Sequence, residues 1–335
     1  MDAHDIDPSM KQQEEKKYYT QKKPWLISRY GEMILDALVF IALTYLLFFV
    51  GQSTLYEPLG RNAAENEAMT MLRESNLYAS RENGGLIERN TEEGYNENLS
   101  PEQNLEYNVL YFYTNSDYAI SHHKLDDFFA SKNASDLFVR IQEGTYDLPK
   151  GSTVATIESW MVAHYERAAV PESAIRKWCE DAYTDAVYFL EHNPLYVTNI
   201  NRTAFVDYFV LLLAEVVAWG IYYVMIPLLL PKRKTLFKLV FRMAVLDKTT
   251  DGNPKPWQIV VRSLTLLLLC IALPTTWYFF IGNGIGYLAM LFPAAEILLM
   301  GVTKANTSIH DLLSQTYVVS TQKSASDILL EQEEK

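Results

Sequence analysis

Four long apolar segments constrain this chain more than any other feature of its sequence. A helix needs about 20 mostly apolar residues to cross about 30 Å of hydrocarbon, and it satisfies all its own backbone polar groups where water is absent. Four segments meet this requirement: Met33–Val50, Phe205–Leu230, Gln258–Ile281 and Ile285–Thr303. The sequence therefore predicts an all-α membrane protein with four transmembrane helices. Only Gly282-Asn283-Gly284 separates the last two, which predicts an antiparallel hairpin.

Two other interpretations of these segments fit less well. The first segment follows a basic stretch, as a signal peptide does, but Asp36 interrupts its apolar core and no Ala-x-Ala exit follows. The segments also resemble buried helices of a soluble protein, although four of this length in one chain argue against it.

The distribution of charge predicts how the chain is oriented. Residues 11–30 hold six Lys and Arg, and the 231–257 loop holds seven. In contrast, the twenty residues after the first span and the twenty before the second hold one apiece, Arg61 and Arg202. Because positive residues resist translocation, both termini (1–32 and 304–335) and the 231–257 loop are predicted to be cytoplasmic. Residues 52–203 hold 24 Asp and Glu against 12 Lys and Arg. The net charge of this stretch is therefore −12, which equals the net charge of the whole chain. The 51–204 segment is therefore predicted to be a large acidic extracytoplasmic insertion.

This insertion is predicted to be mostly helical from Ser100 onward. Ser100-Pro101-Glu102 is typical of a helix start, and Pro171-Glu172 opens another helix that runs to His192. Two more helices are expected at 121–130 and 152–169 from apolar spacing. Residues 52–100 show sparse, irregular apolar positions, and 194–201 is expected to be a connector. No alternation strong enough to predict a sheet is present.

Three motifs of the membrane part resemble the RDD family of bacterial integral membrane proteins. The motifs are Arg29-Tyr30-Gly31-Glu32-Met33-Ile34-Leu35-Asp36, then Lys234-Thr235-Leu236-Phe237-Lys238 continuing to Asp247, Asp251-Gly252 and Arg262, and finally Ile309-His310-Asp311 running on to Thr316-Tyr317-Val318-Val319. The resemblance covers residues 25–50 and 205–320 and implies a bacterial plasma-membrane location. The chain departs from the family where two inner-loop glycines are Phe237 and Arg242 and an arginine is Ala244.

The charged residues of these motifs predict ion pairs between helices. Arg29 and Asp36 are seven residues apart and so share one helix face, but they lie about 10 Å apart along the axis. We expect Arg29 to pair with Asp311 and Asp36 to pair with Arg262, because a buried lone charge costs several kcal/mol. Such pairs either clamp the helices at the inner face or bind an ion or solute, and His310 belongs to the same motif.

Two acidic residues lie deeper in the predicted spans. Glu215 and Glu296 are ten and eleven residues inside the second and fourth spans, without a basic residue at matching depth. A carboxyl group there is expected either to be protonated or to bind a cation, which is the chemistry of a proton-coupled or sodium-coupled exchanger. The alternative is a protonated acid that hydrogen-bonds a neighbouring helix or lines a wet crevice.

Other chemistry has weak support in the sequence. His122 with Asp126 and His123 with Asp127 have helical metal-ligand spacing, but each pair lacks a third ligand, so no metal site and no cofactor are predicted. Cys179 and Cys270 are predicted to lie in different environments and not to pair. No common enzyme motif is found and no basic, aromatic pattern suggests nucleic acid, so the chain is expected not to be an enzyme and not to bind nucleic acid.

Two functions therefore remain open. One is transport of a cation or small solute with proton coupling, based on Glu215 and Glu296. The other is a non-catalytic accessory or scaffold subunit that recruits a membrane or envelope protein through residues 51–204. The bilayer is the expected environment in both cases, and either fits a homo-oligomer.

Overall fold

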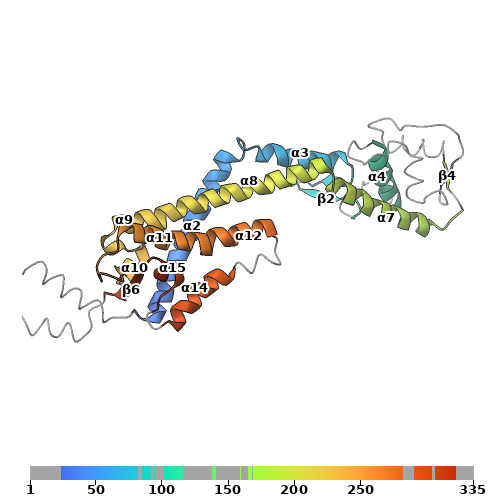
Figure 1. Ribbon diagram of the computed structural model, residues 1–335. Coiled ribbons are helices and arrows are strands. Elements are labelled where there is room, and N and C mark those ends of the chain that lie inside the picture. The colour runs from blue at the N-terminus through green and yellow to red at the C-terminus, as the bar shows by residue number, and fades with distance from the viewer. Residues whose placement is uncertain are drawn as a thin grey trace, which may run out of the picture. The chain divides into compact units, whose positions relative to one another are not determined.

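The computed structural model describes residues 24–81, 85–91, 94, 101–115, 138–140, 159, 165–167, 169–281, 290–303 and 306–321. The described chain is mostly helical, as predicted. It divides into two compact units, residues 1–56 with 207–335 and residues 57–206. Figure 1 labels the helices and strands.

The first unit is built from long apolar helices. Its elements are α2 (Leu26–Leu55), α8 (Pro194–Trp219, which continues from the second unit), α9 (Ile226–Leu229), α10 (Leu236–Val240), α11 (Pro256–Leu266), α12 (Leu273–Ile281), α14 (Leu291–Val302) and α15 (Ile309–Leu313). Within the described residues, three continuous helical stretches are long and apolar enough to cross a membrane: Leu26–Leu55, Pro194–Leu229 and Pro256–Trp277. We call residues 1–56 and 207–335 the membrane unit.

The predicted fourth span is only partly described. Its described part is α14, whose 12 residues cover about 18 Å, less than the hydrocarbon thickness. Residues 282–289, which hold the predicted turn and the start of this span, lie outside the described residues. The four-span count therefore stays a prediction.

Helix α2 has the reverse polarity of a helix on a soluble protein. One face is buried and carries its charged residues, Arg29, Glu32 and Asp36. The opposite face exposes large apolar side chains, which include Ile34, Leu38, Ile41, Tyr45 and Phe49. Surface helices of soluble proteins bury the apolar stripe instead. A helix that meets lipid outside and protein inside has the arrangement seen here.

Two prolines are accommodated without breaking their helices. A π-helical turn, Gly220–Met225, precedes Pro227, and a second, Leu267–Ala272, precedes Pro274. Proline lacks an N–H group and its ring collides with the carbonyl four residues earlier, which here lies inside each π turn. The wider turn relieves this collision, so both stretches stay helical through their prolines.

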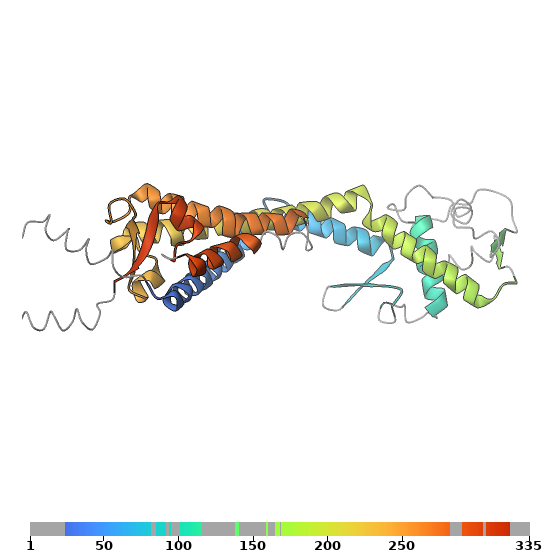
Figure 2. The ribbon, with the colours of Figure 1, turned by 60° about the horizontal axis from the view of Figure 1, so that its bottom comes forward.

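A two-stranded ribbon corrects the all-α prediction. Strand β5 (Met243–Asp247) pairs antiparallel with β6 (Thr316–Ser320), from Met243 opposite Ser320 to Asp247 opposite Thr316. The ribbon joins the loop after α10 to the segment after α15. Figures 1 and 2 both place it with α10 and α15 at one end of the membrane unit's helices.

Residues 57–206, which we call the insert unit, fold around a core of their own. The elements are α3 (Arg61–Glu74), β1 (Tyr78–Ser80), β2 (Leu86–Glu88), α4 (Pro101–Asn115), β3 (Phe138–Arg140), β4 (Tyr165–Arg167) and α7 (Glu172–Glu191), followed by the start of α8. Leu77, Val109, Phe112 and Leu190 are among its fully or almost fully buried side chains. Tyr183 joins α7 to the first hairpin by donating a hydrogen bond to the Leu77 carbonyl at 2.5 Å.

The insert unit confirms some predictions and corrects others. The helices predicted from Pro101 and from Glu172 are present as α4 and α7. The 52–100 segment is more regular than predicted, because it contains the end of α2, then α3 and the β1–β2 hairpin. The predicted 194–201 connector is the first part of α8. Within the predicted 152–169 helix, Tyr165–Arg167 is a strand paired with Phe138–Arg140. The helix predicted at 121–130 lies outside the described residues.

Candidate functional site

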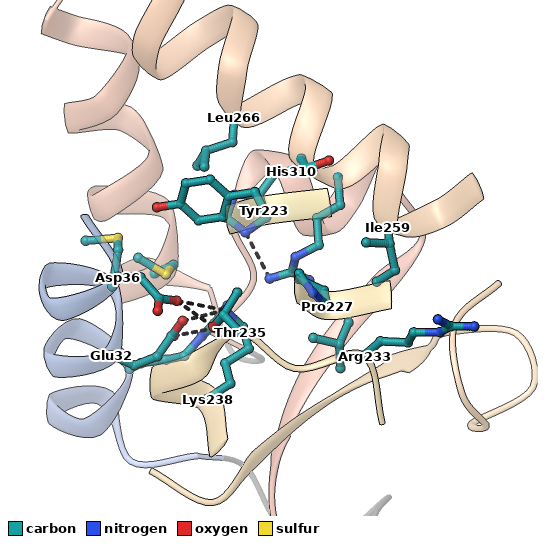
Figure 3. Close-up of a pocket in the computed structure, with 16 residues that line it drawn as sticks. Glu32, Asp36, Tyr223, Pro227, Arg233, Thr235, Lys238, Ile259, Leu266 and His310 are labelled. Carbon is teal, nitrogen blue, oxygen red and sulfur yellow. Dashed lines mark hydrogen bonds and ion pairs between the residues drawn. The ribbon is translucent and has the colours of Figure 1, made fainter. Parts of the chain in front are cut away.

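The membrane unit contains a cavity, lined by both charged and apolar side chains, at the end that carries the ribbon. Its volume is about 640 Å³, including the space that opens outward. Residues from α2, α9 to α11, α14 and α15 and from the π turn before α9 line it, so it is assembled from segments far apart in sequence. Figure 3 shows the side chains of Glu32, Asp36, Thr235 and Lys238 converging on one side, while Arg233 points away from them.

Buried charges of alternating sign form a continuous chain beside this cavity. Asp311 binds two arginines, with Arg29 Nη2 2.9 Å from its Oδ2 and Arg262 Nη1 paired with its Oδ1. Arg29 Nη1 also lies 3.1 Å from Glu32 Oε2, and the other oxygen of Glu32 pairs with Lys238. The order is thus Arg262, Asp311, Arg29, Glu32, Lys238, and it ties α11, α15, α2 and α10 together.

Asp36 ends this chain and has mainly neutral partners. Tyr222 donates its hydroxyl proton to Oδ1 at 2.5 Å, and Thr235 donates to Oδ2 at 2.6 Å. Lys238 Nζ lies farther from Oδ2, at 3.6 Å. Two carboxylates, Glu32 and Asp36, therefore share one ammonium group on the cavity wall.

The start of α15 holds Asp311 in place. Ser308 donates to Asp311 Oδ2 from its hydroxyl at 3.0 Å and from its backbone N–H at 3.3 Å, which forms the capping box of this short helix. Burial acts to raise the pKa of Asp311, but the charges of Arg262, His310 and Arg29 outweigh burial and hold this pKa below its usual value. Asp311 is thus ionised at neutral pH and balances two buried cations.

His310 connects the charge chain to α14. Its Nε2 lies 3.0 Å from Arg262 Nη2 and its Nδ1 lies 3.4 Å from Glu296 Oε1. An arginine only donates, so Nε2 accepts and Nδ1 carries the proton that faces Glu296. Burial lowers the pKa of His310, and the nearby Arg262 acts in the same direction. His310 is therefore neutral in the folded protein near pH 7.

The structure confirms one of the two predicted ion pairs and corrects the other. Arg29 contacts Asp311, as predicted. Arg262 does not pair with Asp36: it contacts Asp311 too, together with Thr316 at 3.0 Å and His310. The reason is the β5–β6 ribbon, which carries Thr316 beside α11 and was not predicted. The cation next to Asp36 is instead Lys238.

The two deeper carboxylates lie in different surroundings. Glu296 was expected to lack a basic neighbour, yet it accepts hydrogen bonds from the backbone N–H groups of Ile309 and His310 at 3.0 and 3.2 Å and contacts the His310 ring. Glu215 accepts one hydrogen bond, from the Thr275 hydroxyl at 2.8 Å. Its other oxygen, Oε2, is buried and has no hydrogen-bond partner among the described residues.

Several residues of the site were not singled out from sequence. Lys238, Thr235 and Tyr222 hold the carboxylates of α2. Thr235 and Lys238 were quoted as part of a family motif, and Lys238 also as an orientation signal, but no partner was predicted for any of the three. A usable signal was present, because Glu32 and Asp36 are four residues apart on one buried face and together demand a positive partner.

No metal site is found in the part of the chain that the structure describes. The His122, His123, Asp126 and Asp127 pairs lie outside that part. Cys179 and Cys270 are not joined by a disulfide, and the first lies in the insert unit and the second in the membrane unit.

Comparison with known proteins gives one match. The sequence model of the RDD family matches residues 185–315. The matched range includes Glu215, Lys238, Arg262, Glu296 and Asp311, while Arg29 and Asp36 precede it. No curated protein and no solved structure gives a significant match. The match confirms the resemblance over these residues: residues 185–315 are similar to the RDD family, and the apolar helices described above are compatible with a membrane protein.

Proposed function

We propose that the membrane unit binds a cation at the Glu32–Asp36 side of its cavity and takes part in transporting it, with protons moving in exchange. The observation that carries this proposal is the sharing of one ammonium group by two carboxylates on the wall of a cavity. Protein groups that bind hard monovalent cations are oxygens, and carboxylate and hydroxyl oxygens converge at this point.

A second acidic group supports a path toward the interior of the membrane. Tyr222, which hydrogen-bonds Asp36, and Glu215 are both buried on the Pro194–Leu229 helix, seven residues or about 10 Å apart along the axis. Glu215 has a buried oxygen without a partner among the described residues. Acidic groups inside membrane helices commonly belong to ion or proton pathways.

The proposal also includes the orientation of the chain in the membrane and the functions that we exclude. Both termini and the 231–257 loop lie in the cytoplasm of a bacterium, residues 51–204 lie outside, and the cavity opens at the inner face. The protein is not an enzyme and does not bind nucleic acid. The orientation rests on the distribution of Lys and Arg, and the bacterial location rests on the family resemblance. The two exclusions rest on the sequence, in which we find no common enzyme motif and no basic, aromatic pattern.

Flux through purified protein tests this proposal. Liposomes containing the full chain and a trapped pH-sensitive dye receive an outward or inward gradient of Na⁺ or K⁺. We expect the intact protein to couple cation movement to a pH change, and Asp36→Asn and Glu215→Gln to lower the rate to that of protein-free liposomes.

The matched control is Asp181→Asn, which neutralises an exposed carboxylate on α7. It should leave the flux unchanged. Equal flux in the intact protein, Asp36→Asn and Glu215→Gln would overturn the proposal, and so would the absence of any flux in the intact protein.

A second function is favoured by the insert unit, which has a hydrophobic core of its own. A domain that folds around its own core suits recruitment of a membrane or envelope protein, and the chain would then be an accessory or scaffold subunit. Detergent pulldowns with and without residues 57–206 test this role. An unchanged set of bound proteins after the deletion would remove it.

A further inference from the structure

Lys238 places its ammonium group among the same oxygens to which the proposed function assigns a cation. Its ammonium nitrogen pairs with Glu32 Oε1 and lies 3.3 Å from Thr235 Oγ1 and 3.6 Å from Asp36 Oδ2. Its side chain is 8% exposed and lines the cavity. Its described neighbours are thus oxygens from α2 and from the start of α10, which is the type of surrounding that Na⁺ or K⁺ also prefers.

We infer that Lys238 is a tethered cation that competes with a free monovalent cation for the oxygens of Glu32, Asp36 and Thr235, so that the site holds either the ammonium group or the ion. This inference rests on the proposed function for its role in transport. The competition itself is a binding property that is measured without transport.

The contacts of the two carboxylates make such an exchange feasible. When Lys238 leaves, Glu32 keeps its ion pair with Arg29, and Asp36 keeps the hydroxyl groups of Tyr222 and Thr235. Neither carboxylate becomes a buried charge without hydrogen bonds, which would cost several kcal/mol. An incoming cation then replaces the charge that the lysine withdraws.

Lys238 is also better suited to leave than the other buried cations of the cluster. It stands on α10, a helix of five residues, and a lysine side chain is a flexible stem with a single point charge. Arg29 and Arg262 instead share Asp311, which is completely buried. Removing either arginine would leave the buried Asp311 carboxylate with one cationic partner instead of two.

Titration of the purified full-length protein with NaCl or KCl tests the competition. Ionic strength is held constant with choline chloride, and binding is read from the rise in unfolding temperature. Lys238→Gln removes the ammonium group, which repels an incoming cation in the intact protein. We therefore expect half-maximal stabilisation of Lys238→Gln at a cation concentration at least about tenfold lower than in the intact protein.

Three variants separate this effect from a general change of charge. Lys248→Gln removes an exposed lysine from the same cytoplasmic loop and should titrate like the intact protein. Lys238→Arg keeps a positive charge and should show no gain in affinity. Lys238→Gln combined with Asp36→Asn should lose the gain, because one of the two carboxylates is neutral.

The outcomes distinguish the inference from the proposed function. The inference is overturned if Lys238→Gln and the intact protein have the same midpoint, or if neither responds to either ion. If the intact protein exchanges cations in liposomes while Lys238→Gln binds no more tightly, the inference fails and the transport function stands. If Lys238→Gln binds more tightly but no variant supports flux, the cation site stands and transport fails. Should Lys238→Gln not fold, Lys238→Met, which keeps an unbranched side chain without the charge and leaves both carboxylates in place, is titrated instead, with the same expected shift.

Discussion

Replacing Asp311 by asparagine removes the one negative charge that lies between two buried guanidinium groups. The side chain of Asp311 is completely buried and contacts Arg29 and Arg262, which are themselves 2% and 8% exposed. Asparagine has nearly the same shape and keeps an oxygen for the Ser308 hydroxyl, so the change tests charge rather than packing. Arg262 then loses its one ion-pair partner among the described residues, while Arg29 keeps Glu32 alone.

The expected loss of stability is large. Breaking a buried ion pair by removing one partner costs about 3–5 kcal/mol. For a unit of this size each kcal/mol lowers the unfolding temperature by about 2–4 °C, which gives a decrease of about 6–20 °C. The assay is thermal unfolding of the full chain in detergent at pH 7.5, followed by tryptophan fluorescence.

Two companion variants decide whether the reasoning holds. Asp181→Asn changes an exposed carboxylate of α7 and should shift the unfolding temperature by less than about 2 °C, since an exposed charge contributes little. Asp311→Asn with Arg262→Gln removes one charge of each sign, and its loss should fall short of the sum of the single losses by at least about 1 kcal/mol. The explanation by buried charges would be refuted if the stability losses of the two single variants summed to the loss of the double variant. It would also be refuted if Asp311→Asn lowered the unfolding temperature by less than about 2 °C.

Three further predictions follow from other parts of the structure. Arg242 has a left-handed backbone with φ of 51°, at a position where the family resemblance implies glycine, so Arg242→Gly should stabilise the membrane unit by about 0.5–1 kcal/mol while Arg242→Ala should not, as measured by unfolding temperature. Burial lowers the pKa of His310, so the unfolded chain binds a proton more readily than the folded chain, and stability should fall as the pH drops below about 6.5. In unfolding scans from pH 8 to 5.5, His310→Gln should make this decline less steep. An equally steep decline would contradict the assignment of His310 as a neutral side chain in the folded protein. In the insert unit Leu190 is fully buried and Leu195 is 45% exposed, so proteolysis-detected unfolding should show a loss of about 2–5 kcal/mol for Leu190→Ala and below about 1 kcal/mol for Leu195→Ala, and equal losses would be inconsistent with the described core.

The sequence was a good guide wherever a pattern is local. Apolar length alone located the Leu26–Leu55, Pro194–Leu229 and Pro256–Trp277 helices, because the hydrocarbon thickness fixes how many apolar residues are needed. The starts of α4 and α7 followed from a proline and an early acidic residue. The helical continuation of α2 to Leu55 was missed because polar residues hide the end of a helix that leaves the apolar layer.

The partners of the charged residues depended on contacts between distant segments. Arg29 and Asp311 were matched because only an opposite charge relieves the cost of burial. The same rule allowed Arg262 for Asp36, and nothing in the sequence excluded it. The β5–β6 ribbon decided the matter, because it positions Thr316 and α15 beside Arg262 and leaves the Asp36 side to α10.

By itself the sequence determined that this chain makes helices long and apolar enough to cross a membrane, and that the charges at one end of these helices must find partners of opposite sign. Both follow from the free energy of moving groups out of water. Which partners meet, and that Lys238 stands between Glu32 and Asp36 at a cavity, was decided only by the tertiary structure. The physical reason is that burial sets the sign and number of the charges that must balance, whereas the packing of α2, α10, α11 and α15 sets the distances over which they balance.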